Sequence, residues 1–378
     1  MIQAVYIHIP FCHQICHYCD FNKVFLKGQP VDEYLNHLNL EMRNTLQQVP
    51  TESVKTIFIG GGTPTALNEE QLAKLLDMIR FHFPNWSDDI EFTVEANPGD
   101  LTTEKLKVLK SGGINRLSIG VQSFNNELLK QIGRTHESND VFAGIKRARE
   151  AGFSNISIDL IYSLPNQTIE DFKETLQQAF SLNIEHFSAY SLIIEPKTVF
   201  YNRMQKGKLP LPSHESEAAM FELLMDEMKK NGYEQYEISN FSKQGFESKH
   251  NLTYWDNEEY YGFGAGAHSY VQGKRIANAG PLKKYMTLVE EQGTPYIEEH
   301  IVSTKEKMEE ELFLGLRKAE GVSIALFNKK YKISLEDLFR EPIEENKKRE
   351  LLKQENGYLF LTRTGKLLGN EVFQSFLG

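Results

Sequence analysis

Short runs typical of β-strands alternate with amphipathic helical stretches from the start of this 378-residue chain to about residue 200. The strand candidates are compact runs of Val, Ile, Phe, Tyr and Leu, at residues 4–10, 54–60, 89–97, 116–122, 155–163 and 186–194. The helical patterns between them repeat apolar residues at intervals of three and four, at residues 69–83, 103–111, 125–132, 140–151 and 169–181. Six such units in succession predict an α/β fold with a parallel sheet, as a full or partial (β/α)6 barrel of the TIM type.

The remainder of the chain is less regular. Acidic and aromatic residues mark the stretch that follows residue 200, and helical patterns resume at Ser303. A strand-like run after Gly357 suggests the wing of a winged helix, although the acidic residues nearby argue against DNA as its partner. The three parts that we expect are a core over 1–235, a connecting region over 236–300 and a smaller, mainly helical C-terminal accessory domain over 301–378.

The composition is that of an ordinary globular protein, with 40% hydrophobic and 25% charged residues. No apolar run approaches the roughly 18 residues that cross a bilayer. The first residues lack the basic and apolar regions of a signal peptide, so we expect a cytoplasmic protein. A net charge of −10 argues against nucleic acid as a partner, because phosphate contacts require clustered Lys and Arg.

All three cysteines of the chain, Cys12, Cys16 and Cys19, lie within eight residues, directly after the first predicted strand. Three thiolates can hold three irons of a [4Fe–4S] cluster and leave the fourth iron open. A disulfide framework would use an even number of cysteines. A structural zinc site needs four ligands, so zinc would require His13 or His17 as the fourth and stays an alternative.

Polar residues recur at the ends of the following strands, where chemistry gathers in barrels of this kind. Gly60 begins the run Gly-Gly-Gly-Thr-Pro after the second strand, Glu95 ends the third and Gln122 ends the fourth. Asp159 lies inside the fifth strand, where a carboxylate is costly unless it is paired. At any single position an internal salt bridge is as good an explanation, but the series indicates a ligand site.

These motifs together resemble the radical S-adenosylmethionine (SAM) superfamily, and within it the branch of anaerobic coproporphyrinogen III oxidases and the heme chaperones related to them. The resemblance covers roughly residues 4–280. It implies a partial barrel, a [4Fe–4S] cluster, and SAM bound at the open iron, where electron transfer cleaves a carbon–sulfur bond. By position, the residues that match the SAM site are Tyr6, Tyr18 (near the adenine), Gly61, Gly62, Thr63, Glu95, Gln122, Arg134 and Asp159.

Two features favour the chaperones over the oxidases of this branch. The oxidase motif continues to a further cysteine at a position that Phe21 occupies here, and we expect no N-terminal extension like that of the oxidases. The run from His250 to Trp255 resembles the heme-associated His-Asn-x-x-Tyr-Trp motif of the chaperones. Imidazole ligates heme iron and the aromatic rings offer flat apolar area, although a structural histidine is the alternative. Arg275 and Asn278 are weaker candidates for propionate or SAM contacts.

The sequence therefore predicts a heme chaperone that binds heme and transfers it to acceptor hemoproteins, with His250 as candidate heme ligand. Membrane-associated cytochromes as acceptors, flavodoxin or ferredoxin as electron donor, and a homodimer belong to the same interpretation. The rival is an enzyme, an oxygen-independent coproporphyrinogen III oxidase that abstracts a β-hydrogen from a propionate by radical chemistry, with loss of carbon dioxide and an electron. An RNA-modifying radical SAM enzyme suits the cysteines but not the acidic charge.

Overall fold

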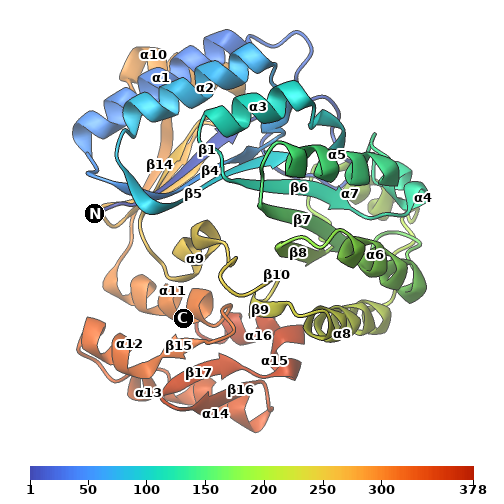
Figure 1. Cartoon of the computed structure of the whole chain (residues 1–378). Coiled ribbons are helices and arrows are strands. Elements are labelled where there is room, and N and C mark those ends of the chain that lie inside the picture. The colour runs from blue at the N-terminus through green and yellow to red at the C-terminus, as the bar shows by residue number, and fades with distance from the viewer.

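The computed structural model describes all 378 residues and is built around a twelve-stranded sheet. Seven neighbouring strands of this sheet run parallel, and its two edges do not meet, so the barrel is partial. Helices cover the convex face (Figure 1). The α/β class predicted from the sequence is confirmed. The six predicted strands are β1 (Ala4–Ile9), β4 (Val54–Gly61), β5 (Trp86–Ala96), β6 (Arg116–Gln122), β7 (Asn155–Tyr162) and β8 (His186–Ser191).

The helices after these strands follow the predicted periodicity, and α6 (Ile169–Ser181) shows why. Thr168 caps its N-terminus in a capping box with Asp171, which satisfies backbone donors that have no partner within the helix. Phe172, Leu176 and other residues at helical spacing are buried against the sheet. The other predicted helices are α2 (Glu69–His82), α3 (Thr103–Ser111), α4 (Asn126–Gln131) and α5 (Ser138–Glu150).

Several elements were not among those predicted. Helix α1 (Val31–Gln48) follows the cysteine segment and buries Tyr34, Leu35, Leu38 and Met42 in a core of 60 residues. Residues 236–300 extend the sheet beyond both ends of the predicted series, which a pattern of local periodicity does not reveal. The added elements are β9 (Glu234–Glu237), β10 (Asn240–Ser242), β11 (Tyr260–Phe263), β12 (His268–Val271), β13 (Lys274–Asn278), β14 (Tyr296–Ile301), α7 (Val199–Gln205), α8 (His214–Lys230), α9 (Lys249–Trp255) and α10 (Leu282–Gln292).

The C-terminal region has a hydrophobic core of its own, made of 16 buried residues. Figure 1 shows it as a separate red and orange layer, facing the concave side of the large sheet across α9. No helix of the chain is long and apolar enough to span a bilayer. The elements of this region are α11 (Thr304–Gly315), β15 (Val322–Ser323), α12 (Ile324–Tyr331), α13 (Leu335–Leu338), α14 (Arg340–Lys348), β16 (Leu352–Glu355), β17 (Tyr358–Leu361), α15 (Arg363–Leu367) and α16 (Gly369–Gln374).

A buried carboxyl group, Glu41, joins α1 to β13, to the end of β11 and to α10. Its oxygens accept hydrogen bonds from Tyr285 (2.6 Å), from the backbone N–H of Gly264 (2.9 Å) and from Asn278 (2.7 Å). Burial outweighs these donors and raises the pKa of Glu41 to about 7. The folded chain therefore holds a proton on Glu41 over a pH range in which the unfolded chain does not.

We expect this group to make stability fall as pH rises from about 4.5 towards 7, because the folded pKa lies above the unfolded value. The contribution is on the order of 3 kcal/mol at most. In Glu41→Gln, which cannot ionise, the melting temperature should lie below that of the wild type at pH 5, and the gap should shrink by pH 8. The exposed Glu33→Gln on the same helix is the control. A gap that does not change between pH 5 and pH 8 would contradict this assignment.

Candidate functional site

The cysteine segment is held in place by short-range backbone contacts at the end of β1. Strand β2 (Phe11–Cys12) pairs in parallel with β3 (Val24–Phe25), which closes the intervening segment into a loop. The backbone N–H of His17 donates to Ile132 O, and His17 Nδ1 lies 2.8 Å from Gln131 O. No group of three or more His, Cys, Asp or Glu side chains converges on a single metal position, so neither His13 nor His17 completes a zinc site in this structure.

The three thiols face a cavity of about 120 Å³ instead of converging on one point, so they do not form a mononuclear metal site. A cube-shaped cluster has the opposite requirement, because each thiolate binds a different iron. Thr63 Oγ1 lies 3.7 Å from Cys12 Sγ and Arg134 Nη1 lies 3.5 Å from Cys16 Sγ. Burial raises the pKa of Cys12, and it raises that of Cys19 to about 11. Thiolates in this loop therefore need positive charge nearby, which iron would supply.

The glycine run after β4 forms one wall of this cavity. Gly61 has φ +114°, and its N–H donates to Glu95 Oε2 at 3.0 Å. A Cβ atom on Gly62 would lie 2.8 Å from the Pro10 backbone and 2.9 Å from Cys12 Sγ. Glycine is needed here because the strand end passes directly against the cysteine loop.

The polar residues at the next strand ends complete the wall, and Arg134 crosses it. Arg134 Nη2 donates to Asn97 Oδ1 at 2.9 Å and also to the Gly120 carbonyl. Gln122 adopts φ +67° at an irregularity in the pairing of β6 with β7, which is a costly conformation for a residue other than glycine. Backbone strain of this kind is typical of ligand sites.

Two carboxyl groups, Glu95 and Asp159, face the cavity from different strands. Burial and the neighbouring Asp159 raise the pKa of Glu95 to about 8, and the pKa of Asp159 is also raised by burial. Ser118 Oγ donates to Asp159 Oδ1 at 3.2 Å. Burial therefore disfavours the charged form of both carboxyl groups, and a cation bound beside them would favour it.

A second cavity of about 430 Å³ adjoins the first and continues towards the concave side of the sheet. The two share part of their lining, including Tyr18, Phe21, Gln122 and both carboxyl groups. Phe21 is 62% exposed at its rim, and Ile193 is 67% exposed. The site is therefore a continuous hollow, with thiols at one end and aromatic and apolar groups at the other.

Comparison with known proteins accounts for this geometry. A model of the radical SAM superfamily matches residues 6–179, and a model of the HemN C-terminal domain matches residues 302–368. The heme chaperone HemW of Bacillus subtilis is 56% identical over 377 residues, covering 100% of both chains. The chain belongs to the HemW family of the radical SAM superfamily. The HemW of Lactococcus lactis is 48% identical, covering 99% of this chain and 97% of its own.

Among solved structures, the coproporphyrinogen III oxidase HemN of Escherichia coli matches with a TM-score of 0.88 at 26% identity. The match covers 99% of this chain and 90% of that enzyme. The cofactors of this HemW-family chain are a [4Fe–4S] cluster and SAM, as its superfamily implies. The lining fits both, because three separated thiols, a glycine wall and two buried carboxyl groups with raised pKa values meet at one cavity.

The structure brings most of the residues predicted for SAM together, but Tyr6 is an exception. Its hydroxyl lies 3.0 Å from His8 Nδ1, and its ring stacks on Phe58 at 6.1 Å. It lines neither the 120 Å³ nor the 430 Å³ cavity, and its partner His8 is the side chain that packs against Gly61. Tyr18, Gly61, Gly62, Thr63, Glu95, Gln122, Arg134 and Asp159 all line the first cavity.

His250 is the second departure from expectation. Its side chain is 1% exposed, and it stacks on Phe58 at 5.2 Å beneath the second cavity. Nδ1 lies 2.9 Å from Thr56 Oγ1, and Nε2 lies 2.8 Å from Tyr254 OH. Burial lowers the pKa of His250 to about 3, so the ring is neutral. In this conformation neither nitrogen is free to bind iron, and the motif forms the floor of the barrel.

The sequence analysis missed several residues of the site. Asn97, Ser118, Tyr190 and Asn251 line one or both cavities. Asn97 and Ser118 alternate along strands already identified, so the period of two gave a signal for them. Asn251 lies on α9, far along the chain from the predicted strands, and no local sequence pattern indicates that it lines the cavity.

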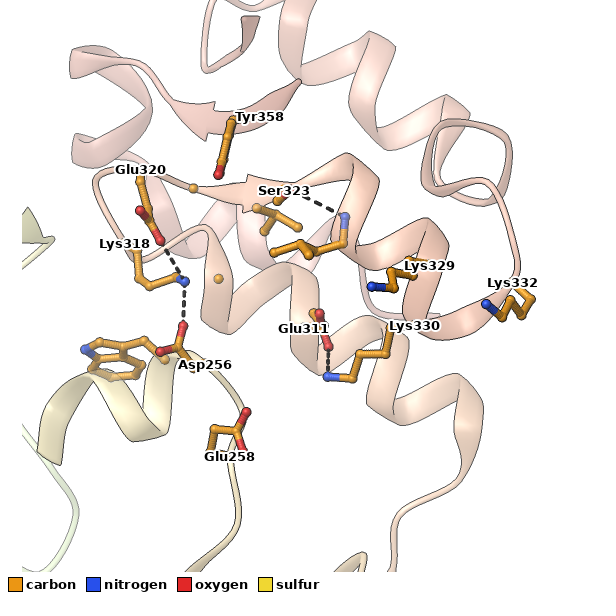
Figure 2. Close-up of a pocket in the computed structure, with 15 residues that line it drawn as sticks. Asp256, Glu258, Glu311, Lys318, Glu320, Ser323, Lys329, Lys330, Lys332 and Tyr358 are labelled. Carbon is orange, nitrogen blue, oxygen red and sulfur yellow. Dashed lines mark hydrogen bonds and ion pairs between the residues drawn. The ribbon is translucent and has the colours of Figure 1, made fainter. Parts of the chain in front are cut away.

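A separate cavity of about 530 Å³ lies between the end of α9 and the C-terminal region (Figure 2). Several of its charges are paired: Lys318 Nζ lies 2.6 Å from Asp256 and 3.2 Å from Glu320, and Lys330 lies 2.5 Å from Glu311. Figure 2 shows that the Lys318–Asp256 pair joins the end of α9 to the C-terminal region, whereas the other two pairs lie within that region. This ion pair indicates a joint between two parts of the chain.

We expect Gly62→Ala to lower the iron and sulfide content after anaerobic reconstitution at least about tenfold, because its methyl group overlaps Cys12 Sγ in a close-packed wall. Gly99→Ala is the matched control, because a Cβ atom there meets nothing within 4 Å. Equal iron content in the two variants would show that the wall does not constrain the cluster.

Proposed function

We propose that this protein is a heme chaperone, which binds heme and transfers it to acceptor hemoproteins. The observation that carries the proposal is similarity along the full length to the heme chaperone of Bacillus subtilis, 56% identical with no part of either chain left out. Phe21 supports it, because the oxidases of the branch have a cysteine there. Heme is the cargo in this role, and the cluster and SAM are resident cofactors.

The chain's residues divide the work of holding the cofactors. Cys12, Cys16 and Cys19 would hold three irons of the cluster, which supplies an electron to SAM when both are bound. The backbone of Gly61 and Gly62 with Thr63 and Glu95 would hold the amino-acid part of SAM, and Tyr18 would pack near the adenine. The residues that would hold the rest of SAM are Gln122, Arg134 and Asp159. Tyr6 would act only through His8, which packs against Gly61.

Glu95 and Asp159 give this site its selectivity for a positively charged ligand. Without a cation, burial raises the pKa of both groups, that of Glu95 to about 8. An ammonium or sulfonium group in the cavity would favour the ionised carboxylates and displace those protons. Arg134 also maintains the shape of the wall, because its Nη2 donates to Asn97 and to the Gly120 carbonyl.

The enzymatic alternative, oxidative decarboxylation of coproporphyrinogen III, is not favoured. The likeness to HemN concerns the scaffold, which both branches share. We further propose a flavodoxin or ferredoxin as electron donor, cytochromes of the membrane among the acceptors, and a homodimer as the working form. The cluster end of the cavity, with the exposed rings of Phe21 and Phe25, is the place where a donor would approach.

The decisive measurement is made on the anaerobically reconstituted protein. We expect it to bind heme stoichiometrically, to pass that heme to an apo-form of a b-type cytochrome domain, and to leave coproporphyrinogen III unchanged when SAM and a reductant are present. Absorbance of the acceptor and chromatography of the porphyrins measure the two activities. Decarboxylation of coproporphyrinogen, with no heme transfer, would replace this proposal by the oxidase.

His250 is tested separately, because a structural role beneath the cavity and a role as heme iron ligand predict different absorbance spectra for the heme-bound variant. As a floor residue, His250→Ala should lower stability by on the order of 2 kcal/mol, since Thr56 and Tyr254 lose a buried partner, and should leave the Soret band of bound heme in place. Tyr254→Phe, which removes only the contact of Tyr254 OH with His250 Nε2, is the control for a loss of stability that leaves the imidazole in place. A Soret shift seen only in His250→Ala would show that α9 opens and that His250 ligates the iron.

A further inference from the structure

Arg116 is a buried cation without a protein partner. It begins β6, where it pairs in register with Thr93 on β5 and Asn155 on β7, and it is 2% exposed. No hydrogen bond or ion pair within the chain reaches its guanidinium, and its Nε is buried with no acceptor. A guanidinium stays charged in proteins, so an unpaired one in the interior carries a large cost in free energy.

Arg116 lines the 430 Å³ cavity together with Phe58, Ser188 and Asn251. It stands at the start of β6, whereas Gln122, which lines the cavity of the thiols, stands at the end of that strand. Arg116 does not line the smaller cavity that holds the three thiols. The hollow therefore runs from the cluster past the apolar rim to a fixed positive charge at the floor.

The titratable groups packed around Arg116 do not neutralise it. His186 is fully buried, its Nδ1 lies 2.7 Å from Ser157 Oγ and its Nε2 lies 2.8 Å from Tyr236 OH. Burial and the charge of Arg116 lower the pKa of both His186 and His250, so both rings are neutral. Asp159 is the acidic group that feels the charge of Arg116, but it accepts from Ser118 and forms no ion pair with Arg116.

We propose that Arg116 binds a carboxylate of the ligand in this cavity, a propionate of the tetrapyrrole, as a specificity-determining residue for the cargo. The inference rests on the proposed heme-chaperone function. A guanidinium binds a carboxylate through two parallel hydrogen bonds, which offsets the cost of its burial and fixes the orientation of the ligand. The carboxylate of SAM is the other source of this chemistry, but Arg116 is absent from the lining of the cavity that holds the thiols.

A second arginine competes for the same role, and its surroundings argue against it. Arg275 lines a cavity of about 380 Å³ beside Tyr254 and Trp255. Its Nη2 already donates to Glu310 at 2.9 Å and to Asn257 at 2.8 Å, and its guanidinium stacks on Tyr270 at 3.9 Å. Arg275 is therefore partnered by the protein, whereas Arg116 is not.

The test compares heme with heme dimethyl ester, in which both propionates are esterified, by absorbance titration of the reconstituted protein. We expect the wild type to bind the ester at least about tenfold more weakly than heme, as befits a lost charged hydrogen bond. Arg116→Gln should bind heme as weakly as it binds the ester, so that the ratio of the two affinities falls to about one. Arg116→Lys should recover part of that ratio, and Arg275→Gln should keep the wild-type ratio.

Three results would overturn the proposal. The first is a wild type that binds heme and ester equally well, which needs no variant and stands even if Arg116→Gln fails to fold. The second is a folded Arg116→Gln, judged by its melting temperature, with the wild-type ratio. The third is loss of SAM affinity in Arg116→Gln with the heme-to-ester ratio intact, which would assign Arg116 to the SAM carboxylate. A wild type that binds neither porphyrin instead refutes the chaperone function itself, and this inference with it.

Discussion

The pairing of β1 with β4 is the contact on which the site depends. The two strands run parallel in the middle of the sheet, and their register places Ile9 beside Gly61. The cysteine loop leaves β1 at this point and the glycine run leaves β4, so both emerge at the same edge. Gly62 N–H donates to Ile9 O and Thr63 N–H donates to Phe11 O, which prolongs the pairing beyond the strands. A shift of one residue would turn the cysteine loop away from the cavity.

The interior of the barrel holds several titratable groups that a purely structural core would not retain. Glu95, Asp159 and Arg116 all come from parallel strands, and each is costly to bury. The free-energy cost of burial differs between the two carboxyl groups and the guanidinium. A buried carboxyl group can lower this cost by taking up a proton, and burial raises the pKa of both Glu95 and Asp159, whereas a guanidinium stays charged. A ligand with a positive group near the cluster and a negative group at the floor would relieve all three.

Local patterns predicted the parallel strands well because each strand is a short apolar run bounded by turn residues. The site residues at the strand ends followed from the same topology, since parallel strands present their carboxyl ends along one edge. What sequence reasoning could not give was partnership across long separations. His250 was chosen for its motif, but its contact with Thr56 joins residues 194 apart in the chain and is a property of the packed molecule. Tyr6 was assigned by its position in the family resemblance, and only the packed molecule shows that it lines neither cavity.

The His-Asn-x-x-Tyr-Trp motif shows how one set of residues can serve the fold and the cargo together. Helix α9 is fixed by Glu91, whose oxygens accept from Ser248 and from the N–H groups of Lys249 and His250. That anchor holds the first turn of the helix under the barrel, so that His250 supports Phe58 while Asn251 reaches the cavity. The motif therefore closes the end of the hollow opposite the cluster. In a chaperone, the depth of this floor sets how far the cargo can enter, which makes the motif important for heme whether or not its histidine touches the iron.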